Sequence, residues 1–398
     1  MPSVTPASDK PRHSVAPTFD VQTLGVFLAG SPVGTLAQTP DGPVAFEYHD
    51  EWLAHGFSIS PLSLPLEKRL FVAAPRPLEG LFGVFDDSLP DGWGRLLVDR
   101  MFREHGVDTF VVTPLTRLAI VGSSGMGALE YEPELTLMPQ AAERTLDELA
   151  DECAEMLRTD FSDDLDTLYA LGGSSGGARP KIFTDIDEEP WIVKFPSSHD
   201  PADIATQEFA IAQAASACGI AMPEVRLLPS SKRDGFFAIK RFDRSKGRAD
   251  GVPSRVHMAS AGALLETSHR IPNLDYGILM KLTMRLTTDL EEIARLYRLM
   301  TFNVIIGNRD DHAKNFTYLC DGGAWRLSPG YDLTHNSGIN GEHSTTVNGK
   351  GRDIDLEDLL AVAAGAGISR TAALAITREI SDAANDLLAG VIPLERLA

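Results

Sequence analysis

Two short polar segments in the C-terminal third of the chain carry side chains suited to metal binding. Asp310 and Asn315 lie five residues apart, and a second aspartate, Asp332, follows seventeen residues after Asn315. Magnesium is a hard cation that takes oxygen ligands, so the carboxylate of Asp332 and the amide oxygen of Asn315 suit it. These residue types favour phosphoryl transfer, which needs reactants held in line and charge neutralised by magnesium. For Asp310 and Asn315 alone, a charged surface turn is the alternative, because Asp, Asn and Gly favour turns.

The order Asp, Asn, Asp at this rough spacing is the one that a protein kinase uses. In that arrangement one aspartate, here Asp310, receives the proton of the attacking hydroxyl, the asparagine holds a metal ion, and the later aspartate bridges metal and phosphates. His312 and Lys314 lie in the same turn as Asp310 and Asn315 and are placed to face the phosphates.

A glycine-rich segment precedes these residues. Four glycines and two serines occupy residues 172–177, and Lys181 follows closely. Glycine permits positive φ and close backbone approach, so this segment is suited to curl around phosphates while Lys181 offers a point charge. It is not a Walker A sequence, since no Gly-Lys-Ser/Thr occurs. A flexible linker is the alternative, but short apolar runs at 182–183 and 191–195 predict two strands of a hairpin, joined by a polar turn over 184–190.

Lys194 lies within the second of these strands, among apolar neighbours. Such a lysine is either an edge-strand charge or a kinase-type phosphate ligand. A helix is predicted from residue 202, and Glu208 lies on or near its apolar side. A carboxylate there prefers a cationic partner, so we expect a Lys194–Glu208 pair, with a solvated glutamate as the alternative.

The remaining elements are predicted from periodicity and turn residues. Residues 236–242 are predicted to form a strand, and Phe242 at its end is placed either to pack on an adenine ring or simply in the core. Residues 245–275 are loop-rich and could carry a substrate-binding segment, and 335–351 are expected to form a mobile loop. Helices are predicted from Asp289, over 356–364 and over 371–389, with a short strand at 325–327.

The N-terminal part predicts a small β-rich unit. Residues 21–28 and 43–48 are expected to form strands of a hairpin, with a turn over 29–34, and a turn at 90–94 leads into a helix. The glycine-rich run 121–128 is interpreted as a turn and not as a ligand loop, because no basic residue follows it. Residues 132–145 are expected to be a linker, followed by an amphipathic helix over 146–158. The predicted divisions are a disordered tail over 1–18, an N-terminal subdomain over 19–135, the rest of an N-lobe over 146–250, and a helical catalytic lobe over 251–398.

Composition bounds the partners and the compartment. The chain has 398 residues, 43% apolar and 23% charged, with a formal net charge of -20, so it is a poor bulk binder of nucleic acid. Cys153, Cys218 and Cys320 lack metal-site spacing and are interpreted as core thiols of a reducing compartment. The sequence predicts no membrane span and no signal peptide, so a cytoplasmic location is expected.

With these segments in hand, the chain resembles the HipA family of serine/threonine kinases, the toxin half of bacterial toxin–antitoxin pairs. The resemblance rests on residues 172–181, 192–196, 240–244 and 307–316 followed by Tyr331-Asp332. The Asp-x-His-x-Lys-Asn run is quite specific to this family. The Leu89-Pro-Asp-Gly-Trp93 turn is a weaker match to the family's N-terminal subdomain. The resemblance implies a two-lobed, protein-kinase-like α+β fold with a β-rich N-terminal subdomain and a mainly helical C-terminal lobe.

The resemblance also implies roles for individual residues. Asp310 would be catalytic, Asn315 and Asp332 would hold Mg²⁺, and Ser174 or Ser175 would be autophosphorylated, which switches off ATP binding in this family. The loop departs from some members at Ala178-Arg179-Pro180, which leaves open which serine is modified. The residues expected to bind ATP are Gly176, Gly177, Ala178, Arg179, Lys181, Lys194, Glu208, Lys240, Phe242, His312, Lys314, Asn315, Tyr331 and Asp332.

The family further implies a small DNA-binding, HipB-like antitoxin as partner, with DNA contacted only indirectly. Known members phosphorylate aminoacyl-tRNA synthetases, although nothing in this sequence identifies the target. Two other functions stay open: a small-molecule kinase, which would share the Asp310–Asn315 type of loop, and a non-catalytic scaffold or co-repressor. The presence of Lys194, Asp310, Asn315 and Asp332 together argues against the scaffold.

Overall fold

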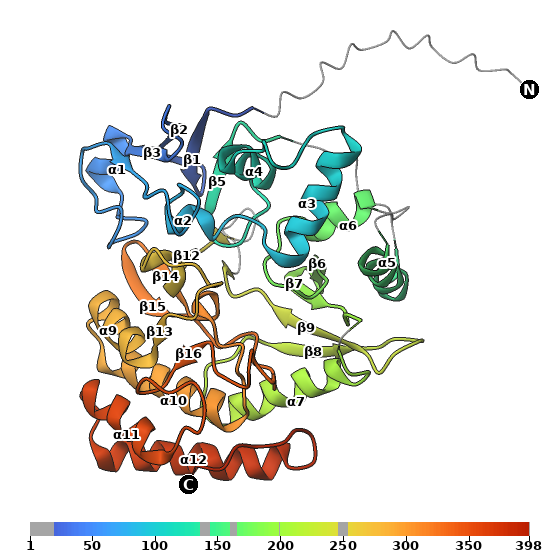
Figure 1. The fold of residues 1–398 in the computed structure, drawn as a ribbon, viewed down its shortest axis with the longest axis vertical. Helices are drawn as coiled ribbons and strands as arrows, with labels where there is room; N and C mark the ends of the chain where they lie inside the picture. The colour runs from blue at the N-terminus through green and yellow to red at the C-terminus, as the bar shows by residue number, and fades with distance from the viewer. Residues whose placement is uncertain (1–19, 136–143, 160–164, 199, 246–253, 398) are drawn as a thin grey trace, which may run out of the picture.

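The structure is a computed structural model that describes residues 20–135, 144–159, 165–198, 200–245 and 254–397. The expected tail over 1–18 and most of the expected linker lie outside these residues. In Figure 1 the N-terminal strands lie at the top, the C-terminal helices lie at the bottom, and a second sheet lies between them on the right. Among the described residues, no helix is both long and apolar enough to cross a membrane.

The N-terminal region is a five-stranded antiparallel sheet in the order β4-β3-β2-β1-β5, with short helices around it. Its elements are β1 (Thr23–Leu28), β2 (Ser31–Gln38), β3 (Val44–Tyr48), α1 (Asp50–His55), β4 (Phe71–Val72), α2 (Gly83–Asp86), α3 (Gly92–Glu104), α4 (Pro114–Val121) and β5 (Leu129–Glu132).

The expected hairpin between 21–28 and 43–48 is wrong, because β2 lies between these two strands. The turn is only Ala29-Gly30, both with positive φ, as two-residue hairpins require. The proline at Pro32 suggested that the turn continued to residue 34. In the structure it falls where the register of β1 and β2 shifts, and a bulge is a place where a strand tolerates proline.

The middle of the chain forms a four-stranded antiparallel sheet in the order β6-β7-β9-β8. Its elements are α5 (Leu146–Arg158), α6 (Leu165–Gly172), β6 (Lys181–Ile186), β7 (Glu189–Lys194), α7 (Ile204–Ala217), β8 (Val225–Leu228) and β9 (Phe236–Lys240). The expected β6–β7 hairpin is present, but its turn is shorter than 184–190. Asp187 and Glu188, both at positive φ, are enough to reverse the chain.

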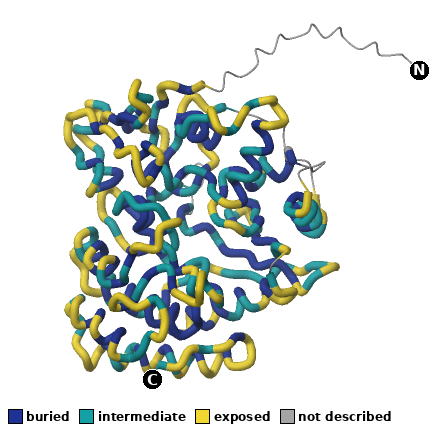
Figure 2. The backbone as a smooth tube through the Cα atoms, in the orientation of Figure 1, coloured by how far each residue is buried: buried dark blue, intermediate teal, exposed yellow. Residues whose placement is uncertain are grey.

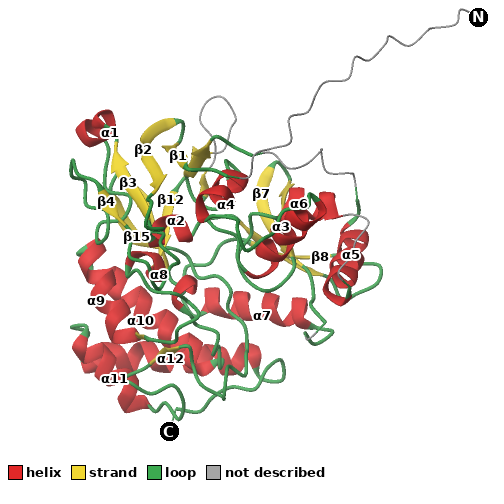
Figure 3. Cartoon of the chain, turned by 45° about the horizontal axis from the view of Figure 1, so that its top comes forward, coloured by secondary structure: helices red, strands yellow, loops and turns green. Residues whose placement is uncertain are grey.

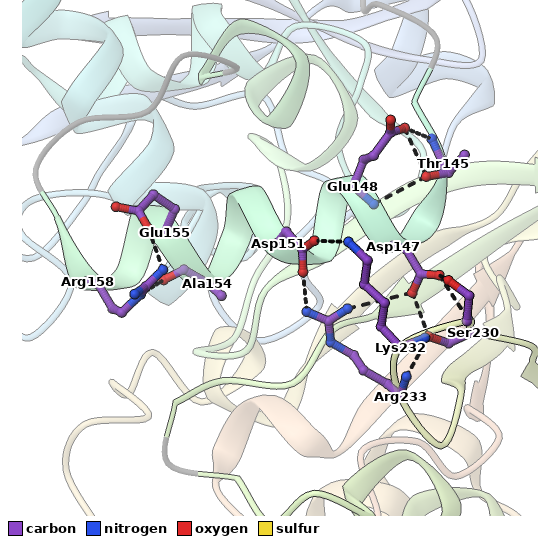
Figure 4. Close-up of polar contacts among 11 residues, drawn as sticks. Thr145, Asp147, Glu148, Asp151, Ala154, Glu155, Arg158, Ser230, Lys232 and Arg233 are labelled. Atoms are coloured by element: carbon purple, nitrogen blue, oxygen red, sulfur yellow. Dashed lines mark hydrogen bonds and ion pairs between the residues drawn. The ribbon is translucent and has the colours of Figure 1, made fainter.

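Helix α5 has the bounds that the sequence predicts. Thr145 and Glu148 form a capping box at its N-terminus, which satisfies two backbone donors reciprocally. Figure 4 shows Asp147 and Asp151 reaching the loop between β8 and β9, where Asp147 accepts from Ser230 at 2.5 Å and Asp151 pairs with Lys232 at 2.6 Å. Because the Asp151–Lys232 pair is solvent-exposed, it contributes little, and the buried side of α5 supplies most of its anchoring.

The C-terminal region is mainly helical, as expected. Its elements are β10 (Arg244–Ser245), β11 (Ser254–Arg255), β12 (His257–Ser260), α8 (Ala261–Leu264), β13 (Leu274–Asp275), α9 (Tyr276–Thr287), α10 (Leu290–Ile305), η1 (Ala313–Asn315), β14 (Thr317–Asp321), β15 (Ala324–Leu327), β16 (Thr345–Thr346), α11 (Leu356–Gly365) and α12 (Arg370–Leu388). Helices α9 to α12 lie together at the lower left of Figure 3.

The largest hydrophobic core runs from the N-terminal sheet into the helices of the C-terminal region, and it includes Val26, Phe46, Tyr297, Phe302 and Leu359. A second core lies between α3, α5, α6 and the four-stranded sheet. Figure 2 shows buried backbone in both the upper and lower parts of the molecule. All three cysteines are buried and unpaired, which confirms their core role. The predicted domain boundaries stay predictions.

Candidate active site

A cavity of about 480 Å³ lies where the glycine-rich segment, the four-stranded sheet, the N-terminal region and the 310–315 loop meet. Its volume is within the range of small-molecule sites. Most of the sequence-predicted site residues line it. These are Ser174, Ser175, Gly176, Gly177, Ala178, Lys181, Lys194, Lys240, Phe242, Asp310, His312, Lys314, Asn315, Tyr331 and Asp332.

Lys194 is the central charge of the site. It leaves the end of β7 and forms ion pairs with Glu208 of α7 and, at 2.8 Å, with Asp332 Oδ1. The lysine and Glu208 are buried, so each needs the other's charge. Burial alone would lower the pKa of Lys194, but the carboxylates of Asp332 and Glu208 raise it. Lys194 in turn holds the pKa of Asp332 well below its usual range, so both groups are charged.

Helix α10 ends at Ile305, and Gly307, with φ of 62°, lies in the turn that leads to the 310–315 loop. The Asn315 side-chain nitrogen donates to the Asp310 main-chain oxygen at 2.7 Å, which leaves the Asn315 amide oxygen available for a metal ion. Tyr331 donates its hydroxyl to the Lys314 carbonyl at 2.5 Å and so ties the loop to the residue before Asp332. Burial in the cleft raises the pKa of Asp310, with the carboxylates of Asp332 and Asp311 adding to the effect and His312 opposing it.

Asp311, within this loop, anchors it to buried residues of other segments. It is fully buried and accepts hydrogen bonds from Tyr276 at 2.9 Å and from the Thr345 backbone at 3.1 Å, and its Oδ2 lies 3.0 Å from His343 Nδ1. His343 and Thr345 belong to the 335–351 segment, which the sequence suggested was simply a mobile loop. This segment has irregular backbone and is nevertheless anchored, because its contacts with the buried Asp311 join residues that are distant in sequence and leave no periodic pattern.

The glycine-rich segment turns sharply between α6 and β6. Gly177 has φ of 83°, a conformation that favours glycine. Ser175 is fully buried and donates to the Gly172 carbonyl at 2.6 Å, whereas Ser174 is half-buried and donates to the Ser124 carbonyl at 3.1 Å. Burial lowers the pKa of Lys181, whose ammonium lies beside Gly177.

Some predicted residues hold other positions. Arg179 and Glu208 lie outside the cavity lining, and Arg179 supports the site by pairing with Glu208 at 2.8 Å. The ammonium of Lys240 pairs with Glu189 and Glu224, so it is not free for a phosphate. Phe242 lines the cavity with its ring 5.4 Å from that of Tyr331, which gives an apolar wall suited to a flat base.

One side of the cavity is formed by residues that were not predicted from the sequence. Asp91, at the start of α3, contacts both Gly177 and Lys314, and Met126 and Ala128 of the second glycine-rich run line the wall. That run is a turn, as expected, yet it also borders the cavity. The buried Asp243 holds it there, accepting from the Gly127 backbone at 2.7 Å. His269, of the loop-rich 245–275 segment, also lines the cavity.

The donor set fits magnesium bound with a nucleotide. Among the described residues, no three His, Cys, Asp or Glu side chains are grouped to bind a metal ion on their own. Magnesium usually takes only one or two protein oxygens and completes its shell with phosphate oxygens and water. Asp332 and Asn315 match that number, and both line the cavity beside Lys181 and Lys194.

Comparisons with known proteins agree with this geometry. Residues 173–388 match the HipA-like C-terminal domain, and residues 24–132 match the HipA N-terminal domain. Two Sinorhizobium fredii proteins named "Putative kinase Y4mE" and "Putative kinase Y4dM" are 28% and 25% identical to this chain over 345 and 352 residues. The first match covers 79% of this chain and 77% of the relative, and the second covers 82% and 81%.

A solved complex of HipA, HipB and operator DNA from Shewanella oneidensis MR-1 contains a chain of similar fold. The two chains superpose with a TM-score of 0.69 and are 18% identical in sequence. The match covers 94% of this chain and 92% of the Shewanella chain. This likeness confirms the expected fold, with a β-rich N-terminal region and a mainly helical C-terminal region.

Proposed function

Because the chain belongs to the HipA family, we propose that it is an ATP- and magnesium-dependent protein kinase acting on serine or threonine. One observation carries the proposal. Lys194 pairs with Glu208 and Asp332. Lys194, Asp310, Asn315 and Asp332, which are scattered over the sequence, line one cavity. A Lys–Glu pair next to a metal-binding aspartate is the arrangement that a protein kinase needs.

Each residue has a distinct task in this proposal. Lys194 and Lys181 attract the nucleotide phosphates, and the glycine-rich segment covers them. Phe242 packs against the adenine. Asn315 and Asp332 hold magnesium, which when bound neutralises phosphate charge and keeps the phosphates in line.

Asp310 acts on the acceptor. Its carboxylate orients the serine or threonine hydroxyl and takes its proton as the new bond forms between the acceptor oxygen and the γ-phosphorus. The bond from the γ-phosphorus to the bridging oxygen breaks, and ADP leaves with that electron pair. Lys194 and Lys181 stabilise the charge that develops on the phosphate oxygens.

The glycine-rich segment is a candidate for self-modification. Ser174 is the better acceptor of its two serines, because its hydroxyl is half-buried while that of Ser175 is enclosed against Gly172. A phosphate on Ser174 would bring negative charge to the place where nucleotide phosphates bind, and like-charge repulsion would lower ATP affinity.

We propose a HipB-like, DNA-binding antitoxin as partner, by analogy with the Shewanella oneidensis assembly. The net charge of -20 supports contact with DNA through the partner and not directly. The proposal that the phosphate acceptor is a protein such as an aminoacyl-tRNA synthetase rests on the family resemblance alone.

The test is transfer of labelled γ-phosphate in a lysate of the source organism. Wild-type protein with magnesium should label protein bands, and removal of magnesium by a chelator should abolish the label. Asp310→Asn should lose transfer while still binding ATP. Label that appears only in small molecules would favour a metabolite kinase, and full activity of Asp310→Asn would contradict the proposed role of Asp310.

A further inference from the structure

The turn Pro90–Gly94, at the start of α3, reaches both halves of the active site. Asp91 Oδ1 accepts a hydrogen bond from the Gly177 backbone in the glycine-rich segment, and Asp91 Oδ2 lies 3.3 Å from Lys314 Nζ in the 310–315 loop. The described hydrogen bonds and ion pairs therefore connect the nucleotide-facing loop to the catalytic loop through one carboxylate from the N-terminal region.

The backbone of the same turn is packed against the glycine-rich segment. Trp93 N donates to Gly177 O at 2.9 Å. A Cβ at Gly92 would collide with Gly177 O, and a Cβ at Gly94 would collide with Ser175 O. Only glycine permits this approach, so the turn fits the loop conformation seen here.

The Asp91 side chain does not cap its own helix. Asp91 is the N-cap residue of α3, where an aspartate ordinarily accepts from the first turn of its helix. Here the helix receives no side-chain cap, and both carboxylate oxygens point to the site instead.

We propose that Asp91 is a positioning residue, which holds the glycine-rich segment in register with the 310–315 loop so that nucleotide phosphates meet both. The N-terminal region thus helps to position the loops of the nucleotide site and is not only an appended subdomain. The inference concerns how the chain's own loops are held, and only its kinetic consequence rests on the proposed function.

Asp86 provides a matched control. It also pairs with Lys314, at 3.5 Å, but makes no described contact with the glycine-rich segment. The variants to compare are Asp91→Ala, which loses both contacts, Asp91→Asn, which keeps an acceptor for Gly177 but no charge for Lys314, and Asp86→Ala, which loses only a Lys314 contact.

The experiment is hydrogen–deuterium exchange on the nucleotide-free protein, followed in peptides that cover residues 173–180. Exchange in this segment should rise about ten- to a hundredfold in Asp91→Ala, the range for losing a hydrogen bond to a charged acceptor. It should stay near wild type in Asp91→Asn and in Asp86→Ala. Unchanged exchange in Asp91→Ala, or an equal rise in either of the other variants, would overturn the proposal.

A second readout is the KM for Mg·ATP. Both Asp91 variants should raise it about tenfold or more with melting temperatures close to wild type, because the loops are no longer held together. If Asp91→Ala does not fold, an increase in KM for Asp91→Asn but not for Asp86→Ala still supports the proposal, and equal KM values would contradict it. Because the exchange measurement needs no catalysis, a protein without kinase activity would refute the proposed function and leave this inference testable.

Discussion

Lys194 Nζ and Asp332 Oδ1 lie 2.8 Å apart although their residues are separated by 138 positions in the chain. Asp332 adopts φ of 54°, an uncommon conformation for a residue with a side chain, and such strain clusters at functional sites. Lys194 also pairs with the buried Glu208. Lys194 of the four-stranded sheet, Glu208 of α7 and Asp332 of the C-terminal region therefore form one network. In the proposed kinase this network places Asp332 for magnesium.

Lys194→Met tests the network with little change in side-chain length. Phosphoryl transfer should fall by about a hundred- to a thousandfold, since a preorganised cation is lost from the transition state. The protein should remain folded, because Glu208 keeps Arg179 as a partner at 2.8 Å. The measurement is the initial rate of phosphoryl transfer at saturating Mg·ATP, and circular dichroism checks that the variant is folded. Lys68→Met, which removes an exposed surface pair with Asp50, should behave as wild type.

Asp311→Ala should destabilise the protein and reduce activity together. The buried hydroxyl of Tyr276 and the Thr345 backbone N–H would lose their acceptor, which costs about 3 kcal/mol or more in free energy of unfolding. Urea unfolding measures the loss, and Asp382→Ala on the exposed side of α12 is the control. A variant as stable as wild type would show that Asp311 does not anchor the loop.

His257 predicts a pH dependence of stability. It is buried, with Nε2 2.8 Å from the Ile59 carbonyl, and burial lowers its pKa to about 4. In the unfolded chain the ordinary pKa is near 6.5, so the unfolded state binds the proton first as pH falls. Stability should therefore decrease between about pH 7 and about pH 5, with His257 accounting for about 2 kcal/mol of the loss.

His257→Gln keeps a donor for Ile59 but does not titrate in this range. Urea unfolding at the two pH values should give a smaller loss for this variant than for wild type. Equal losses would mean that His257 is not the group responsible.

Local motifs made much of the site predictable. Asp310, Asn315 and Asp332 lie in short segments whose order carries the chemistry, and the Lys194–Glu208 pair followed from a lysine in an apolar strand and a glutamate near the apolar side of the next helix. Helices α5, α11 and α12 were predicted from the pattern of apolar residues. In each case the signal lies within about twenty residues.

The missed features depend on contacts between distant segments. The turn at Asp91 was recognised as a turn, but nothing local identifies Gly177 and Lys314 as the residues that it contacts. The run 121–128 was correctly interpreted as a turn, while its place at the cavity is set by Asp243, which is remote in sequence. The glycines Gly92 and Gly94 were the available signal, because two glycines within the first turn of a helix indicate close approach by another backbone.

The most direct test of the account is the intact mass of purified protein before and after incubation with Mg·ATP, compared with Asp310→Gln. We expect the wild-type protein to be heavier by one phosphate, already as purified or after incubation, with the phosphate mapped to Ser174 and absent from both Asp310→Gln and Ser174→Ala. The same phosphate on Asp310→Gln after incubation would contradict the assignment of Asp310. Wild-type protein that binds ATP but carries no phosphate before or after incubation would contradict self-modification of the glycine-rich segment.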